Sequence, residues 1–212
     1  MKIQRLMLGM IQTNCYIVSD ERTKEAIVID PADEAEKIIA FLKEHQLSLQ
    51  AILLTHGHFD HIYGTEDLRN YFSVKVYANN TEKELLKNPE WNCSSHIARE
   101  ISLIADEWVN DGDKLEFGSL SCEVIETPGH TRGSVCYYFK LQNCLFSGDT
   151  LFLESIGRSD MPTGNGHQII ESVRTKLMPL PDETKVYPGH GAETSIGYER
   201  RNNPYINENG WE

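Results

Sequence analysis

The chain has 212 residues, 40% of them hydrophobic and 25% charged, a composition ordinary for a globular protein with one sizeable core. Its 32 acidic and 20 basic residues give a formal net charge of −12 without a cluster of Lys and Arg, which argues against nucleic acid and anionic membranes as partners. No stretch of 18 apolar residues exists and the N-terminus lacks a signal-peptide core, so we expect a cytoplasmic protein. The five cysteines are odd in number and widely spaced, which argues against a disulfide framework or a zinc ribbon.

The first part of the chain predicts strands that give way to alternating strands and helices. Three short runs are typical of strands: Ile3–Leu8, Asn14–Ser19 and Ala26–Asp30. Pro31 ends the third, and Asp33 can cap a helix that continues to about His45, because apolar residues recur there at helical spacing. A strand, a helix and a further strand follow: Ala51–Leu54, Gly64–Phe72 and Val74–Ala78.

The second part returns to strands after a mixed middle. A capping-box pattern predicts a short helix over Thr81–Leu86, with Thr81 as cap and Glu84 as its partner. Asn88–Ser95 is a loop, either a lid or ordinary surface, and His96–Ile104 has helical character. The remaining predicted elements are four strands (Lys114–Phe117, Leu120–Thr127, Ser134–Lys140 and Cys144–Phe146), a helix (Gly166–Leu177), a strand (Lys185–Tyr187) and a helix (Thr194–Asn202). No linker interrupts them, so we expect a single domain over residues 1–212 with two packed sheets and helices outside both.

The most informative stretch, Thr55–His61, directly follows the apolar strand Ala51–Leu54. It places three histidines and an aspartate within six residues. In an extended segment, residues two apart point to the same side, so His56 and His58 can converge on one ion. Asp60 and His61 come where the chain turns and can face a second point nearby. Imidazole and carboxylate ligands together suit zinc, iron or manganese, and a surface loop rich in histidine is the weaker interpretation.

Three later loops share the features expected of further metal ligands. Each follows a predicted strand and places a glycine immediately before a histidine or an aspartate, where a tight turn can direct one side chain inward. The three residues are His130, Asp149 and His190. The histidines outside such loops are interpreted as surface residues: His45, His96 and His167.

Together these motifs resemble the metallo-β-lactamase superfamily over nearly the whole chain. The resemblance rests on His56-x-His58-x-Asp60-His61, Pro128-Gly-His130, Ser147-Gly-Asp149 and Pro188-Gly-His190, with Ile29-Asp-Pro31 before them. It implies an α+β fold, a four-layer αββα sandwich that binds two divalent ions, zinc, iron or manganese, at one edge. By position, the resemblance implies these roles: His56, His58 and His130 bind the first ion, Asp60, His61 and His190 bind the second, Asp149 bridges them, and Asp30 supports the ligand loop from behind.

The resemblance also narrows the chemistry. Two divalent ions lower the pKa of bound water toward about 7, so a metal-bound hydroxide can attack an electrophilic carbonyl or a phosphoester. Asp60 is a candidate for orienting that nucleophile or handling a proton. Typical β-lactamases of the superfamily carry a cysteine ligand where Asp149 stands, which argues against antibiotic hydrolysis.

Gly148–Phe152 and the following Gly157–Asp160 segment are most similar to the glyoxalase II-like hydroxyacylglutathione hydrolases. The expected substrate is therefore a small anionic thioester such as S-lactoylglutathione. Only 22 residues follow His190, so we expect a single domain without the helical C-terminal domain of full-length glyoxalase II.

Two questions stay open from sequence alone. Arg158 matches the region where relatives place a basic residue against the carboxylate of the thiol carrier, and a salt bridge to Asp160 is an equally good interpretation. The alternatives to a thioesterase are a mononuclear iron persulfide dioxygenase, a lactone or ester hydrolase of the same fold, and a metal-binding module without catalysis. The sequence leaves the oligomeric state undetermined.

Overall fold

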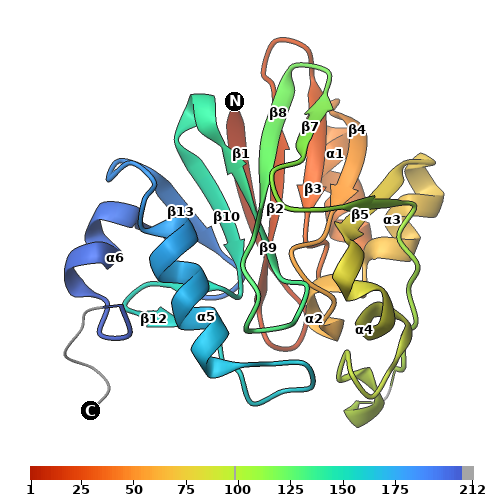
Figure 1. Cartoon of the computed structure of the whole chain (residues 1–212). Helices are drawn as coiled ribbons and strands as arrows, with labels where there is room; N and C mark the ends of the chain where they lie inside the picture. The colour runs from red at the N-terminus through yellow and green to blue at the C-terminus, as the bar shows by residue number, and fades with distance from the viewer. Residues whose placement is uncertain (98, 207–212) are drawn as a thin grey trace.

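The computed structural model describes residues 1–97 and 99–206, and its longer strands form two six-stranded sheets (Figure 1). The first sheet has the order β1 (Lys2–Leu8), β2 (Thr13–Ser19), β3 (Glu25–Ile29), β4 (Ser48–Leu53), β5 (Lys75–Asn79) and β6 (Glu107–Val109). The second has the order β14 (Thr194–Ser195), β13 (Lys185–Pro188), β10 (Cys144–Gly148), β9 (Val135–Phe139), β8 (Leu120–Glu126) and β7 (Lys114–Phe117). A small hairpin, β11 (Leu151–Phe152) with β12 (Ser155–Ile156), was not predicted.

The two sheets pack face to face, and helices cover both outer faces. Between the sheets, the rings of Tyr16 and Phe146 lie 5.2 Å apart and those of Phe146 and Tyr187 lie 5.1 Å apart. The outer face of the first sheet packs against α1 (Ala35–Glu44) and α3 (Thr65–Phe72), and that of the second against α5 (Gly166–Ser172), η4 (Val173–Leu177) and α6 (Ile196–Asn202). Figure 1 shows α1 and α3 on one side of the strands and α5 and α6 on the other. The predicted αββα sandwich is confirmed.

Strand direction brings the loops of interest to one edge. In the second sheet β8 and β10 are both antiparallel to β9, and β10 is parallel to β13, so the C-terminal ends of β8, β10 and β13 lie together. The loop after β4 of the first sheet reaches the same edge, where the N–H of Val135 donates to the carbonyl of Thr55 at 2.8 Å and the hydroxyl of Tyr137 donates to that of Leu54 at 2.9 Å.

Two predicted helix caps and one predicted helix are wrong. Asp33 does not cap α1; Glu34 does so in the left-handed conformation with φ 53°, without a side-chain cap. The turn predicted to start at Thr81 starts earlier, as a 3₁₀ turn η1 (Asn80–Glu82) capped by Asn79, whose side chain accepts from the N–H of Thr81, and continues as α4 (Lys83–Lys87). Of the described residues in 96–104, only His96 belongs to a helical turn, the 3₁₀ turn η2 (Ser94–His96).

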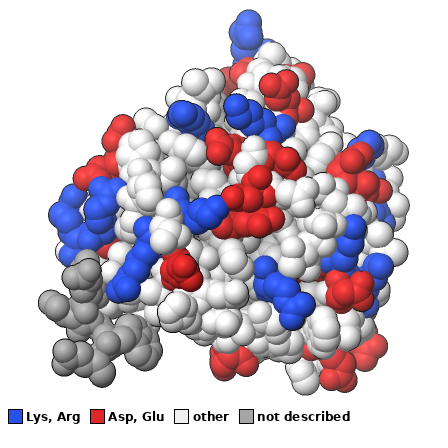
Figure 2. Space-filling view, in the orientation of Figure 1, with Lys and Arg blue, Asp and Glu red and all other residues white. Residues whose placement is uncertain are grey.

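Charged side chains are mixed and paired on the surface. On the face in Figure 2, acidic and basic side chains both lie around the molecule, with basic ones gathered over α5 and α6. There Arg200 and Arg201 pair with Asp182, and Lys176 pairs with Asp111. The described part of the chain contains no helix that is both long and apolar enough to cross a membrane.

Candidate metal centre

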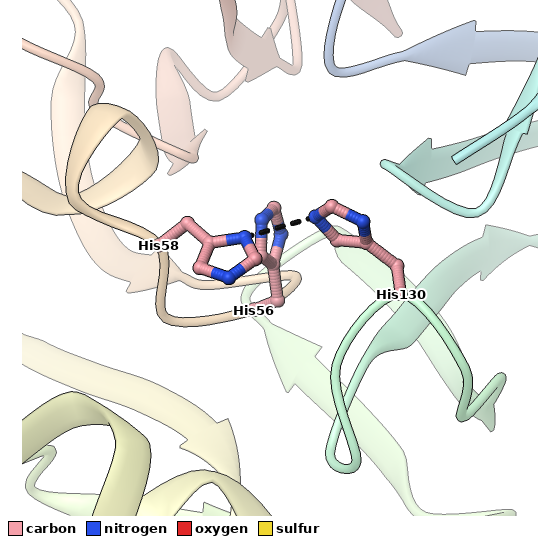
Figure 3. Close-up of side chains that lie close together, drawn as sticks. All are labelled: His56, His58 and His130. Carbon is pink, nitrogen blue, oxygen red and sulfur yellow. Dashed lines mark hydrogen bonds between the residues drawn. The ribbon is translucent and has the colours of Figure 1, made fainter. Parts of the chain in front are cut away.

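His56, His58 and His130 form a compact cluster, here called the three-histidine group (Figure 3). The first two lie in the loop after β4 and the third in the loop after β8, so the cluster joins the two sheets. Their ligand atoms lie within 4.8 Å of one another, and Nδ1 of His58 is 2.9 Å from Nε2 of His130. All three side chains are buried. The geometry is that of three imidazoles facing one point.

A second cluster lies beside the first and is here called the aspartate group: Asp60, His61 and His190. The first two residues belong to the short helix α2 (Phe59–Ile62), and the third follows β13. Oδ2 of Asp60 is 3.3 Å from Nε2 of His61 and 3.2 Å from Nε2 of His190. Turning into α2 directly after His58 is what directs these side chains away from the three-histidine group and toward a second point.

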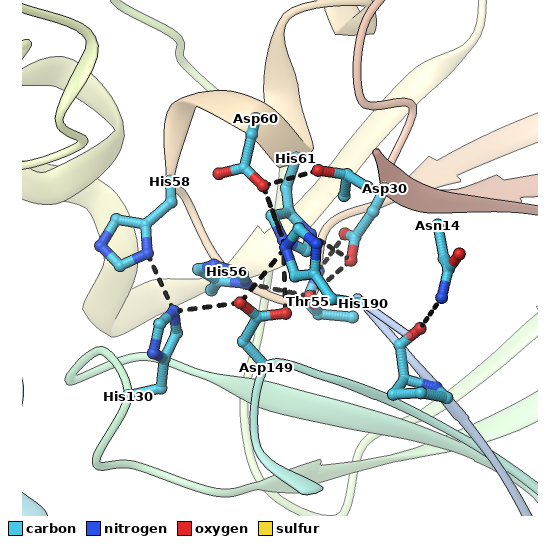
Figure 4. A network of polar contacts seen from close by, with 12 residues as sticks. Asn14, Asp30, Thr55, His56, His58, Asp60, His61, His130, Asp149 and His190 are labelled. Carbon is cyan, nitrogen blue, oxygen red and sulfur yellow. Dashed lines mark hydrogen bonds and ion pairs between the residues drawn. The ribbon is translucent and has the colours of Figure 1, made fainter. Parts of the chain in front are cut away.

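Asp149 lies between the two groups (Figure 4). Its Oδ1 is 3.4 Å from Nε2 of His61, and its Oδ2 is 3.6 Å from the Nε2 atoms of both His130 and His190. The carboxylate therefore faces one histidine of the three-histidine group and two of the aspartate group. The structure thus brings together all seven residues that the sequence predicted as ligands.

Asp30 holds the two groups from behind. Its carboxylate accepts the N–H of Thr55 at 2.8 Å and the hydroxyl of Thr55 at 2.6 Å, and lies 2.9 Å from Nδ1 of His61. The Thr55 hydroxyl is also 3.1 Å from Nδ1 of His56. With Nδ1 occupied in this way, each ring leaves Nε2 free, and such outer partners commonly fix the orientation of metal-binding histidines.

The free atoms at the centre fit metal ions. Three side-chain atoms there are buried and lack a hydrogen-bond partner among the described residues: Nε2 of His56, Nε2 of His61 and Oδ1 of Asp149. His58 presents Nδ1 to the same place, 2.9 Å from Nε2 of His130 (Figure 3). Buried polar atoms nearly always have a hydrogen-bond partner in proteins. Several such atoms without a partner at one place therefore indicate a bound ligand, such as a metal ion, that they can coordinate. Imidazole and carboxylate donors together suit zinc, iron or manganese.

The electrostatics of the three-histidine group favour neutral rings. Burial lowers the pKa of His56 well below its usual value and that of His58 to about 3, and the neighbouring histidines add to the effect. A neutral imidazole is the form that binds a metal. His56 and His58 are therefore ready to bind a cation without first losing protons.

The aspartate group behaves differently. Burial acts to raise the pKa of Asp60, but the charge of His61 and the hydrogen bond from His190 outweigh it and lower the pKa to about 2. Burial acts to lower the pKa of His61, and the surrounding carboxylates raise it well above its usual value. These shifts favour an ionised Asp60 and a protonated His61 in the metal-free protein. A cation that binds here displaces that proton.

A cavity of about 370 Å³ opens over the centre. Its walls beyond the seven residues are mostly apolar, with one basic side chain: Ile11, Phe59, Cys93, Phe152, Arg158 and Met161. A larger groove of about 1050 Å³ runs beside α5 and shares Arg158 with this cavity. Both spaces are wide enough for a small-molecule substrate.

Arg158 forms the salt bridge to Asp160, with Nε and a terminal nitrogen each 2.7 Å from a carboxylate oxygen. Its side chain is 63% exposed and also lines the cavity, so both sequence interpretations describe part of its surroundings. Its backbone carbonyl, which no sequence pattern singles out, lies 2.7 Å from Nδ1 of His130.

Two other contacts at the centre have no signal in the sequence. The hydroxyl of Thr13, on β2, donates to Oδ2 of Asp60 at 2.7 Å, over a separation of 47 residues. The loop Asn88–Ser95 is tied to the centre, because the carbonyl of the fully buried Asn92 accepts the N–H of Phe59 at 2.9 Å. With Cys93 facing the cavity, this loop forms one wall of the site.

The three histidines interpreted as surface residues are all exposed: His45, His96 and His167.

A family model described as the metallo-beta-lactamase superfamily matches residues 8–190 of this chain, and the chain belongs to that superfamily. It is 36% identical over 210 residues to the hydroxyacylglutathione hydrolase GloC of Haemophilus influenzae, covering 98% of this chain and 99% of that protein. The family, this relative and the clustered donors identify a metal-dependent hydrolase.

Two solved structures are similar over almost their full length. The B3 metallo-beta-lactamase BLEG-1 superposes with a TM-score of 0.92 at 41% identity, covering 97% of this chain and 99% of that one. The protein TTHA1623, solved in a di-iron-bound form, superposes with a TM-score of 0.86 at 34% identity, covering 95% and 99%.

Proposed function

We propose that this chain is a thioester hydrolase that binds two divalent metal ions, with zinc as the first choice. The three-histidine group would hold one ion and the aspartate group the other, with the carboxylate of Asp149 available to both. The observation that carries the proposal is the position of Asp149 between the two clusters, 3.4–3.6 Å from histidines of both.

Because one hydrophobic core joins both sheets, we also propose that residues 1–212 act as one domain.

When bound, the two ions would supply Lewis acidity and lower the pKa of a water molecule so that it attacks a carbonyl at neutral pH. The chain contributes orientation and exclusion of water. Asp60 is ionised and held by the Thr13 hydroxyl, so it can accept a hydrogen bond from the attacking water and fix its direction. Phe59 and Phe152 form apolar walls that limit solvent around the reacting group.

The cavity supports a thioester with an anionic carrier. About 370 Å³ accommodates a short acyl group at the metal centre, and Arg158 stands where this cavity meets the groove along α5. A carrier thiol that leaves the acyl group can therefore extend past Arg158. Similarity to GloC, which is described as a hydroxyacylglutathione hydrolase, makes S-lactoylglutathione the first substrate to test.

β-Lactam hydrolysis is the second candidate, because a protein 41% identical to this chain is described as a B3 metallo-beta-lactamase. Both reactions place a nucleophile on a carbonyl carbon, so the same centre can serve either. The difference lies in the leaving group, a thiolate that departs or an amide nitrogen that stays attached.

The test is to reconstitute the metal-free protein separately with zinc, iron and manganese and to count the ions bound per chain. Each form is then assayed with S-lactoylglutathione, a lactone and ester panel, a β-lactam and a persulfide with oxygen uptake. Two ions per chain and preferential turnover of the thioester are expected. One iron per chain with oxygen consumption would contradict the proposal in favour of a persulfide dioxygenase, and metal binding without any turnover would contradict catalysis altogether.

A further inference from the structure

The segment Asn80–Lys87, comprising η1 and α4, packs against both loops that form the three-histidine group. A Cβ added to Gly57, between His56 and His58, would lie 2.7 Å from Cδ2 of Leu85. A Cβ added to Gly133, three residues after His130, would lie 2.7 Å from the backbone nitrogen of Glu82. Neither contact leaves room for a side chain, so this segment is in close contact with both loops.

Glu82 makes polar contacts to the same two loops. Its side chain is buried, and Oε1 accepts the backbone N–H of Gly57 at 3.3 Å and the hydroxyl of Thr131. Thr131 directly follows His130, and Gly57 separates the other two histidines of the group. A single carboxylate oxygen therefore connects the loop after β4 to the loop after β8.

Burying the Glu82 carboxylate in the folded protein costs free energy. Its other oxygen, Oε2, lies beside the backbone of Gly133 without a hydrogen bond of good geometry, and Glu82 forms no ion pair with the described residues. Burial raises the pKa of Glu82 to about 7, although the hydrogen bonds from Thr131 and Gly57 oppose the rise. A buried acid without an ion-pair partner lowers stability even when it accepts hydrogen bonds, so its place at the junction of two ligand loops points to a functional role.

We propose that Glu82 is a positioning residue for metal binding. Its carboxylate fixes the distance between the loop of His56 and His58 and the loop of His130, so that the three rings converge on one ion. The aspartate group lies outside this connection, because neither α2 nor the loop after β13 contacts Glu82 through a hydrogen bond. The inference rests on the proposed two-ion centre and adds a residue that determines the affinity of one of its two sites.

The test separates the two metal sites. In a His190→Ala background the three-histidine group remains complete, and in a His130→Ala background the aspartate group remains complete. Zinc is titrated into each metal-free protein in competition with a chromophoric chelator, with and without Glu82→Ala. Loss of an outer partner weakens metal binding about 10–100-fold, and we expect that loss in the first background and less than about a threefold change in the second.

Three further variants show whether geometry is the cause. Glu82→Gln keeps Oε1 as an acceptor for both donors and is expected to stay within about threefold of the parent. Glu82→Asp keeps the charge but is one methylene shorter, and is expected to lose affinity as Glu82→Ala does. Glu84→Ala, on the exposed side of α4, is the matched control and should change nothing. Circular dichroism of each metal-free protein checks folding, and Glu82→Asp replaces Glu82→Ala if the latter does not fold.

Two results would overturn the role of Glu82: equal losses in both backgrounds, or a Glu82→Gln variant as damaged as Glu82→Ala. A different result distinguishes failure of the centre itself. If the two background variants with Glu82 intact bind no zinc, the two groups are not metal sites. The role proposed for Glu82 is then contradicted as well.

Discussion

Ring orientation decides whether a cluster of histidines can bind metal. Three outer acceptors face the Nδ1 atoms here: Thr55 beside His56, Asp30 beside His61 and the carbonyl of Arg158 beside His130. The Nε2 atoms that remain are directed at the centre. Only some of these partners are visible in a sequence, because a backbone carbonyl carries no residue type.

Arg158 provides a test of substrate charge. Because its guanidinium lines the cavity, Arg158→Ala should raise KM for an anionic thioester about fivefold and leave KM for a neutral ester unchanged. The expected increase in KM is modest because the Arg158 side chain is 63% exposed and already forms a salt bridge with Asp160. Steady-state kinetics on both substrates measure the difference, with Arg132→Ala as an exposed arginine outside the cavity. Equal losses on both substrates would contradict a role in binding the carrier.

Glu82 predicts a pH dependence of stability in the metal-free protein. Its folded pKa of about 7 lies above the ordinary value of 4.5, so the folded protein holds this proton more tightly than the unfolded chain. The resulting stability is complete below the ordinary value and is lost as the pH rises through 7. Between pH 6 and pH 8 the native chain should lose about 1 kcal/mol relative to Glu82→Gln. Denaturant unfolding at both pH values measures this, and parallel curves for the two proteins would exclude the effect.

At the scale of elements, the centre is built from four loops that follow β4, β8, β10 and β13. A glycine precedes the ligand in three of them, and the reasons differ. Gly148 adopts φ 48°, which accommodates the tight turn before Asp149. At Gly189 the reason is space, because an added Cβ would lie 2.2 Å from Oδ1 of Asp149 and 2.6 Å from Cε1 of His61.

Gly189→Ala should therefore lower the zinc affinity of the centre more than it lowers the stability of the fold. The new methyl group displaces Asp149 or His61, and overpacking of this kind costs about 1–3 kcal/mol, equivalent to a loss of zinc affinity of about 5-fold to 150-fold. Zinc titration and thermal unfolding of the metal-free protein are the two measurements. Gly112→Ala is the control, since its φ of 81° adds strain while its Cβ would meet open space. Unchanged zinc affinity in Gly189→Ala would contradict this account.

Across the whole molecule, the proposed ions connect the two sheets. The loop after β4 belongs to the first sheet, and His130, Asp149 and His190 follow strands of the second. Each site draws on both sheets, so unfolding of either half destroys both sites. Metal binding and global stability should consequently be linked.

Removing metal with a chelator should lower the unfolding midpoint, and added zinc should restore it in a concentration-dependent way. A ligand at a thousand times its Kd stabilises the folded state by about 4 kcal/mol. Differential scanning calorimetry over a zinc series gives the shift. His167→Ala, an exposed histidine outside the clusters, should respond as the native chain does. A midpoint independent of zinc would contradict a site that spans both sheets.

Much of this architecture follows from local patterns. Alternating and apolar runs predicted the main strands, and histidines after them predicted the members of the centre. Predictions failed where no periodic signal existed. Asn79 caps the turn assigned to Thr81. The described part of 96–104 lacks the expected helix because burial alternates along it, with Ile101 and Leu103 turned toward the core and their neighbours exposed. The β11–β12 hairpin is too short to show alternation.

The sequence by itself determined which residues can bind metal, because imidazole and carboxylate side chains that directly follow buried strands are the donor groups that zinc, iron and manganese require. Tertiary structure decided how they divide into two groups, since only the packing of two sheets places Asp149 between them. It also decided the role of Glu82, whose polar partners Gly57 and Thr131 are 25 and 49 residues away along the chain. Contacts of that range depend on strand order and loop direction, which no local pattern encodes.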